Sequence, residues 1–182
     1  MAETGSPSGE SALVIHVPEA EDLVGSYRIK YDHAASVGVP AHITLLWPFV
    51  PTSLITPDIQ NQLAHLFSNF HSFQFSLTEL RLFPEVLYLA PSPSDKIIEL
   101  VQIIASRFPK YPPYGRQFKE ISPHLTIAQS DEPKLLEKIA EELNPTAKKA
   151  LPIFKAVTEV SLLEKQNDYW TETRTFPLAA IN

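Results

Sequence analysis

The stretch HITLLWPFV at residues 42–50 decides the fold of this sequence, because its opening tetrad returns as HLTI at residues 124–127. Side chains alternate between the two faces of a β-strand, so His42 and Thr44 share one face, about 7 Å apart. The aliphatic residue between them and the one after Thr44 point the other way, into a core. Two strands are therefore predicted, each held by aliphatic side chains and each presenting an imidazole and a hydroxyl on an open face.

The four polar side chains of this repeat are His42, Thr44, His124 and Thr126, and they suit phosphoryl chemistry. Histidine has an unperturbed pKa near neutrality, so one imidazole can take a proton while the other gives one. Threonine hydroxyls can hydrogen-bond the non-bridging oxygens of a phosphate. Opening a cyclic phosphodiester needs a deprotonated water and a protonated leaving oxygen, which two histidines supply without a metal. The residues alone leave open that one or both histidines are ordinary core or surface residues.

Strand-like and helical segments surround the two motifs. Strands are predicted at residues 11–17, 39–50, 73–81, 86–90, 122–129, 154–165 and 170–178, the last two flanking a polar turn at 166–168. Helices are predicted at residues 19–31, 57–70, 95–108 and 132–143. Short strands mixed with helices and hairpins indicate the α+β class with largely antiparallel sheets. A helix follows the strand in both copies of the motif, which indicates an internal duplication.

Composition is typical of one compact globular domain. The chain has 182 residues, of which 44% are hydrophobic and 20% charged, and no run approaches the ~20 apolar residues of a membrane span. We expect a flexible tail at residues 1–10 and a single domain at residues 11–182. The first residues lack the basic and apolar regions of a signal peptide, and no cysteine is present, so a cytoplasmic location is expected.

Net charge and residue spacing limit the size of the substrate and the kinds of catalytic or metal site that this sequence can form. A formal net charge of −6 argues against tight binding of long nucleic acid and favours a small anionic substrate in a locally positive cleft. The absence of cysteine excludes thiolate catalysis, and His65 and His71 lack the spacing of metal ligands on one helical face, so no metal site is predicted. We interpret His16, His33, His65 and His71 as structural or surface residues.

The two motif strands, HITLLWPF at 42–49 and PHLTIAQ at 123–129, together with an early strand, resemble the signature of the 2H phosphoesterase superfamily. The similarity is strongest to its 2′-5′ RNA ligase-like, or LigT-like, branch of RNA 2′,3′-cyclic phosphodiesterases, and it covers residues 11–180. It implies a two-lobed α+β fold with a pseudo-twofold axis and a central cleft between the lobes. It assigns His42 and His124 as the catalytic acid–base pair, and Thr44 and Thr126 as phosphate-binding residues.

The resemblance also implies a reaction and a partner. It implies metal-independent hydrolysis of a 2′,3′-cyclic phosphate to a 2′-phosphate, with no cofactor and with a 2′-5′ RNA ligase-like activity left open. The substrate is expected to be a small cyclic-phosphate nucleotide or a short RNA end, without binding to long nucleic acid or to membranes. A monomer is favoured. Which histidine is the acid and which the base stays open.

The loop before the second motif, YPPYGR at 111–116, holds two further candidates. Tyr114 or Arg116 can present a ring or a cation to a substrate base or phosphate, although such loops also pack simply on a surface.

Two functions other than hydrolysis of a 2′,3′-cyclic phosphate on a nucleotide or RNA stay open. One is hydrolysis of a cyclic phosphate on a sugar nucleotide, and the other is a nucleotide- or RNA-binding module without catalysis.

Overall fold

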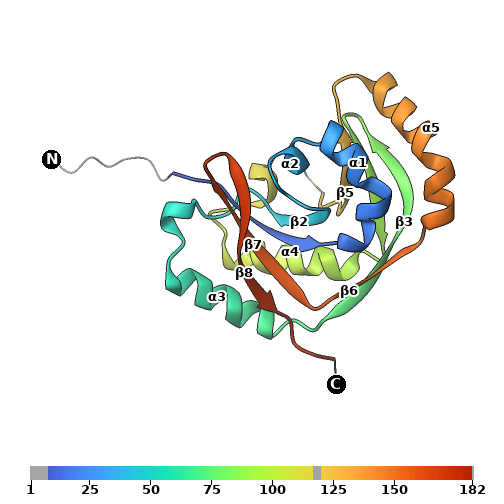
Figure 1. Ribbon diagram of the computed structural model, residues 1–182. Helices are drawn as coiled ribbons and strands as arrows, with labels where there is room; N and C mark the ends of the chain where they lie inside the picture. Colours follow the sequence, from blue (N-terminus) through green and yellow to red (C-terminus); the bar gives the residue numbers. More distant parts are fainter. Residues whose placement is uncertain (1–7, 117–119, 182) are drawn as a thin grey trace.

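Two four-stranded antiparallel sheets form the framework of the computed structural model, which describes residues 8–116 and 120–181 (Figure 1). The first sheet has the order β2-β1-β7-β8 and the second the order β5-β4-β3-β6. The first comprises β1 (Ser11–His16), β2 (His42–Leu46), β7 (Glu159–Gln166) and β8 (Tyr169–Pro177). The second comprises β3 (Phe73–Phe83), β4 (Val86–Ser92), β5 (Leu125–Gln129) and β6 (Ile153–Val157). This confirms the predicted α+β class with antiparallel sheets.

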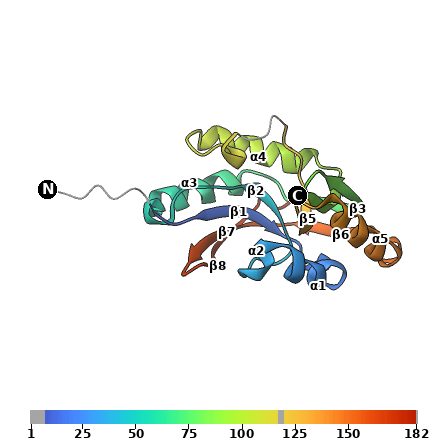
Figure 2. The same ribbon diagram turned by 90° about the horizontal axis from the view of Figure 1, so that it is seen from above.

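Helices connect the two sheets and cover them. The α-helices are α1 (Glu21–Tyr31), α2 (His33–Ser36), α3 (Pro57–Ser68), α4 (Asp95–Arg107) and α5 (Pro133–Ala150). The short 3₁₀ turns are η1 (Pro18–Ala20), η2 (Thr52–Leu54) and η3 (Pro113–Arg116). α1 packs against β5 and α4 packs against β2, so each of these helices contacts the edge strand of the opposite sheet. Figure 2 shows α4 on one side of the first sheet, with α1 and α2 on the other.

The strand pairing is arranged in the same way around the two motifs, as an internal duplication predicts. β1 pairs with β2, and β4 pairs with β5, so each edge strand that carries a motif lies beside the strand that precedes it in the chain. The strands that follow are exchanged between the sheets: β3, after α3, pairs with β4, whereas β7, after α5 and β6, pairs with β1. Two similar units related in this way give the two-lobed, pseudo-twofold arrangement.

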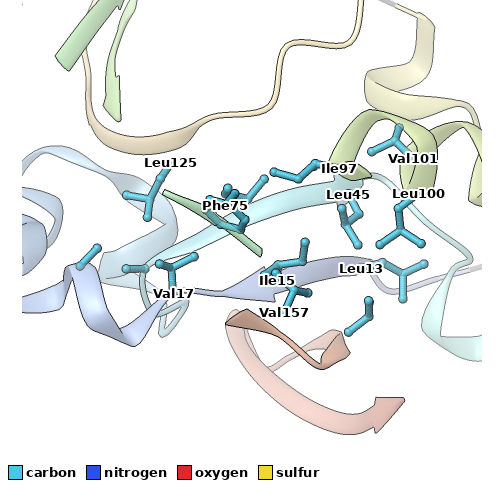
Figure 3. Close-up of a cluster of buried hydrophobic side chains, with 14 of the residues drawn as sticks. Leu13, Ile15, Val17, Leu45, Phe75, Ile97, Leu100, Val101, Leu125 and Val157 are labelled. Carbon is cyan, nitrogen blue, oxygen red and sulfur yellow. The ribbon is translucent and has the colours of Figure 1, made fainter. Parts of the chain in front are cut away.

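One apolar core joins the two sheets. Side chains from β1, β2, β5 and α4 meet in it, among them Leu13, Leu45, Leu125 and Leu100, all at most 1% exposed (Figure 3). The aliphatic residues inside the two motifs belong to this core, as their alternation predicts. Burial on one face of each motif strand therefore fixes the histidine and threonine on the other face, because a register slip of one residue would bury them.

Helix boundaries follow local signals in part. Thr56 caps α3 by accepting a hydrogen bond from Ile59 N at 3.4 Å, with Pro57 in the first turn. Ser94 precedes α4 but makes no side-chain capping hydrogen bond, although serine is a common residue at this position. α5 continues past the predicted end at residue 143 and takes Pro145 into its interior. Buried Ala147 continues its apolar face, so packing outweighs the usual disruption by proline.

Two further segments differ from the prediction. The predicted strand at 154–165 is two strands, β6 and β7, which separate at residue 158 and enter different sheets. Lys148 and Lys149, beyond the predicted end of the last helix, lie in the last turn of α5, where cations complement the helix dipole. The polar hairpin turn is confirmed, since Asn167 and Asp168 both have positive φ, at 50° and 62°.

Two further expectations were a flexible tail at residues 1–10 and the absence of a membrane-spanning segment. Residues 1–7 of the predicted tail lie outside the described residues, whereas Ser8 O accepts a hydrogen bond from Ser53 N at 3.2 Å and Glu10 O accepts one from Lys165 N at 2.9 Å. Within residues 8–116 and 120–181, no helix has the length and apolar character that a bilayer crossing demands.

Candidate functional site

The two motif histidines are held in the same way. Nδ1 of His42 lies 2.8 Å from the carbonyl oxygen of Pro40, and Nδ1 of His124 lies 2.8 Å from that of Ser122. A carbonyl oxygen can only accept, so Nδ1 carries the proton in both rings and leaves Nε2 to exchange a proton with a substrate. Each bond spans two residues of chain, which makes the two motifs local copies of one another.

The fold brings the four predicted motif residues onto neighbouring elements. β2 carries His42 and Thr44, and it contacts β5, which begins at Leu125, directly after His124. His42 and His124 are close enough that a charge on His124 lowers the pKa of His42. Both histidines and both threonines are half-buried, whereas the aliphatic residues between them are fully buried. The site therefore combines two imidazoles and two hydroxyls over a continuous apolar support.

Burial is the main electrostatic influence on both rings. It lowers the pKa of His42 to about 3, although the hydrogen bond that Nδ1 donates to the Pro40 carbonyl acts in the opposite direction, and Arg28, His16 and His124 lower the pKa further. Burial also lowers the pKa of His124, with the Ser122 carbonyl opposing the change. Both imidazoles are consequently neutral at pH 7, and an anionic ligand would favour their protonation.

Tyr114 lies in contact with the first motif. Its hydroxyl shares a hydrogen bond with the side chain of Thr44, and its backbone N donates to Trp47 O at 2.7 Å. The residue has a φ of 49°, in the left-handed region, and burial raises the pKa of its phenol. Of the two loop candidates, Tyr114 therefore lies against the first motif. Arg116 ends η3, and its side chain lies outside the described part of the chain.

Three other groups near the motifs were not predicted from the sequence. Arg28 on α1 is 2% exposed and donates to Thr126 O at 3.1 Å. The rings of Phe83 and Tyr88 stack at 4.3 Å, and each lies 5.6 Å from the His124 ring. His16 is the register partner of His42 across β1 and β2, and its Nε2 lies 3.1 Å from Glu172. All four residues lie far in sequence from the motif that they contact.

The other histidines lie apart from this site. His33, His65 and His71 are exposed, which fits their interpretation as surface residues. In the ranges that the structure describes, no group of three or more histidine, aspartate or glutamate side chains is arranged to hold a metal ion.

Two antiparallel sheets with exchanged strands over a shared core form the fold that this chain has in common with LigT-like 2H phosphoesterase structures. A profile of the 2′-5′ RNA ligase superfamily matches residues 16–169. The chain belongs to this superfamily. A comparison with curated proteins found no match.

Solved structures share this fold over nearly the whole chain. Escherichia coli LigT complexed with NADP+ has a TM-score of 0.59 at 18% identity and covers 96% of this chain and 99% of its own. The same protein complexed with 3′-AMP has a TM-score of 0.61 at 16% identity, covering 93% and 98%. A protein of Thermus thermophilus has a TM-score of 0.60 at 15% identity, covering 95% and 100%. At these identities the likeness concerns the fold.

Proposed function

We propose that this protein hydrolyses a 2′,3′-cyclic phosphate, on a nucleotide or a short RNA end, to a 2′-phosphate. The observation that carries the proposal is the pair of locally identical histidines, each with Nδ1 fixed by a carbonyl and Nε2 left to react. Membership of the 2′-5′ RNA ligase superfamily supports an enzyme that acts on phosphodiesters. His42 and His124 are the proposed acid–base pair, and no metal is required.

The reaction needs two proton transfers and one displacement. One imidazole takes a proton from a water molecule, whose oxygen attacks phosphorus. The bond between phosphorus and the ribose O3′ breaks, and the second imidazole gives its proton to that oxygen. Thr44 and Thr126 donate hydrogen bonds to the non-bridging oxygens, on which charge accumulates in the transition state. Tyr114 orients the Thr44 hydroxyl through their shared hydrogen bond.

A small nucleotide is the proposed substrate. LigT has been crystallised with 3′-AMP and with NADP+, which shows that this fold accommodates small nucleotides in another protein. The net charge of −6 gives the chain few cations for a long phosphate backbone. A panel of a cyclic mononucleotide, a cyclic phosphate on a sugar nucleotide and a cyclic-phosphate RNA end separates these substrates. Binding of all three without turnover would instead establish a recognition module.

Removing either threonine hydroxyl is expected to slow the reaction. Thr44→Ala and Thr126→Ala should each lower kcat by about 10- to 1,000-fold, because each change removes one hydrogen bond that strengthens as charge develops. Tyr114→Phe should cost less, roughly fivefold, the weight of one neutral hydrogen bond of about 1 kcal/mol. Steady-state kinetics on a cyclic nucleotide measures these effects.

Serine provides the matched control for both positions. Thr44→Ser and Thr126→Ser retain the hydroxyl and should keep most of the activity of the unaltered protein. If the alanine and serine variants lost activity equally, the hydroxyls would not be the groups that matter, and the proposed phosphate contacts would be wrong.

A further inference from the structure

Three side chains form a row across the second sheet, and one of them belongs to the second motif. Thr126 of β5 lies opposite Tyr88 of β4, and Tyr88 lies opposite Arg81 of β3. Residues directly opposite one another in antiparallel strands point to the same face of the sheet. The face that carries the second motif therefore continues, two strands away, to an arginine.

Side-chain contacts connect this row to His124. The centroid of the Tyr88 ring lies 5.6 Å from that of His124 and 4.3 Å from that of Phe83. Phe83 follows Arg81 by two residues of β3 and so shares its face. At the outer end of the row, Glu79 and, to a smaller extent, Tyr88 raise the pKa of Arg81. Contacts thus run without a break from His124 through Tyr88 to the guanidinium of Arg81.

The spacing of this row matches the length of one nucleotide. Neighbouring strands lie about 4.8 Å apart, so the backbones at Thr126 and Arg81 are separated by about 10 Å. A nucleotide whose 2′,3′-cyclic phosphate reacts at the motifs carries its 5′ oxygen on the opposite side of the same ribose. A phosphate on that oxygen would lie within reach of the long arginine side chain.

The first sheet offers the opposite charge beside its motif. His16 of β1 lies opposite His42, and its Nε2 lies 3.1 Å from Oε2 of Glu172. Burial lowers the pKa of His16, so at pH 7 this histidine does not neutralise the carboxylate. Lys155, which also acts on His16, is itself paired with Glu19 at 3.1 Å. A second phosphate is therefore better placed over the second sheet, beside the arginine of the row.

We propose that Arg81 forms a second phosphate site, which binds a phosphate on the 5′ oxygen of the nucleotide whose cyclic phosphate is opened. This inference rests on the proposed function and deepens it, because it names the substrate class. The substrate is a nucleotide that is phosphorylated at both ends, either as a mononucleotide or as the last residue of an RNA. A guanidinium suits this role, since its planar set of N–H donors matches the oxygens of a phosphate.

The carboxylate partner of Arg81 leaves room for a phosphate. Glu79 accepts a hydrogen bond from Nη2 of Arg81, and the two side chains are 52% and 56% exposed. An exposed ion pair of this kind contributes little, and a guanidinium has five N–H donors, of which one carboxylate oxygen uses only part. The pair of Arg28 and Asp32 differs, because both residues are at most 3% exposed and lie 2.8 Å apart. Arg81 can therefore exchange its partner for a ligand, whereas the charge of Arg28 stays committed to Asp32.

Steady-state kinetics on three substrates tests the site: adenosine 2′,3′-cyclic phosphate, the same nucleotide with a 5′-phosphate, and a diadenylate that ends in the cyclic phosphate. The unaltered protein should prefer the 5′-phosphorylated nucleotide by about tenfold in kcat/KM, the lower end for a hydrogen bond to a charged group. Arg81→Gln should abolish this preference, mainly through KM, because a contact remote from the reacting phosphorus binds ground state and transition state alike. Arg81→Lys keeps the charge and should retain part of the preference.

The diadenylate identifies the source of the phosphate. A preference for it that also depends on Arg81 would assign the site to the diester of an RNA, whereas a preference confined to the mononucleotide would assign it to a terminal phosphate. Either result supports the site. No preference in the unaltered protein, or an equal preference in Arg81→Gln, would overturn the proposal.

Two further variants serve as comparisons. Glu79→Gln removes the competing carboxylate and should strengthen the preference by about two- to fivefold. Lys96→Met removes a cation that is 57% exposed and paired with Glu99 on α4, and it should leave the preference unaltered. A loss of preference in Lys96→Met as large as in Arg81→Gln would mean that overall charge, and not a site at Arg81, is responsible.

Binding of product-like ligands separates this inference from the proposed function. Calorimetry with adenosine 2′-phosphate and adenosine 2′,5′-bisphosphate needs no turnover, and the unaltered protein should bind the bisphosphate about tenfold more tightly, a difference that Arg81→Gln should remove. If no cyclic substrate were hydrolysed but this difference in binding depended on Arg81, the proposed function would fail and the phosphate site would stand. If turnover were normal and neither turnover nor binding depended on Arg81, the function would stand and the inference would be wrong.

Discussion

His42→Ala and His124→Ala are each expected to lower kcat/KM on a 2′,3′-cyclic nucleotide by about 100- to 10,000-fold, the usual weight of a positioned proton-transfer group. Each change removes one of the two imidazoles whose Nε2 is left to react. The double variant should be little worse than either single variant, because the two groups act on the same displacement. Initial rates of cyclic-phosphate hydrolysis measure all three.

A matched control separates chemistry from general damage. His65 is an exposed histidine on α3, away from both motifs, and His65→Ala should retain the activity of the unaltered protein. Circular dichroism should show that all variants are folded. Near-normal turnover by a folded His42→Ala or His124→Ala protein would refute the paired mechanism.

Asp32→Ala is expected to destabilise the protein by about 3–5 kcal/mol, because it leaves the charge of Arg28 buried without its partner. The two residues lie 2.8 Å apart and are almost completely buried. Asp32 also accepts a hydrogen bond from Ala34 N at 3.0 Å, which caps α2. Urea unfolding followed by fluorescence gives the free energy of unfolding of the variant and of the unaltered protein.

Two comparisons show whether the buried pair is the cause. Asp58→Ala removes an exposed carboxylate from the start of α3 and should cost at most about 0.5 kcal/mol. Replacing both partners with apolar residues, Arg28→Met together with Asp32→Leu, should recover much of the stability lost in Asp32→Ala, since no uncompensated charge is left. A loss for Asp32→Ala no larger than for Asp58→Ala would mean that the ion pair contributes little.

Local patterns predicted the elements that carry the site. Alternation along residues 42–45 and 124–127 correctly separated buried aliphatic from polar residues, because one buried face fixes the register of a strand. The order of strands and helices predicted antiparallel sheets, which are confirmed, and a duplication, with which the matching strand orders of the two sheets are consistent. Residue type within a strand was sufficient for these predictions, since they depend on neighbours close in sequence.

Local sequence patterns could not predict contacts between residues that are far apart in the chain. The bond from Arg28 to Thr126 spans 98 residues, and nothing local marks Arg28 as buried. An arginine and an aspartate four positions apart normally form an exposed pair on a helix, so their spacing predicted no contact with either motif. The separation of β6 from β7 likewise depends on which sheet offers each segment a partner. The contacts of Arg28 and the sheet that each of β6 and β7 joins are seen only in the folded structure.

Phosphorus NMR of the unaltered protein with a 2′,3′-cyclic mononucleotide in excess EDTA tests the central claim most directly. The account predicts that the cyclic-phosphate resonance disappears at a rate unaffected by the chelator and that the product is the 2′-phosphomonoester. This outcome follows if His42 and His124 supply both proton transfers. Intact cyclic phosphate in the presence of the folded protein, or turnover that appears only after a divalent ion is added, would contradict it.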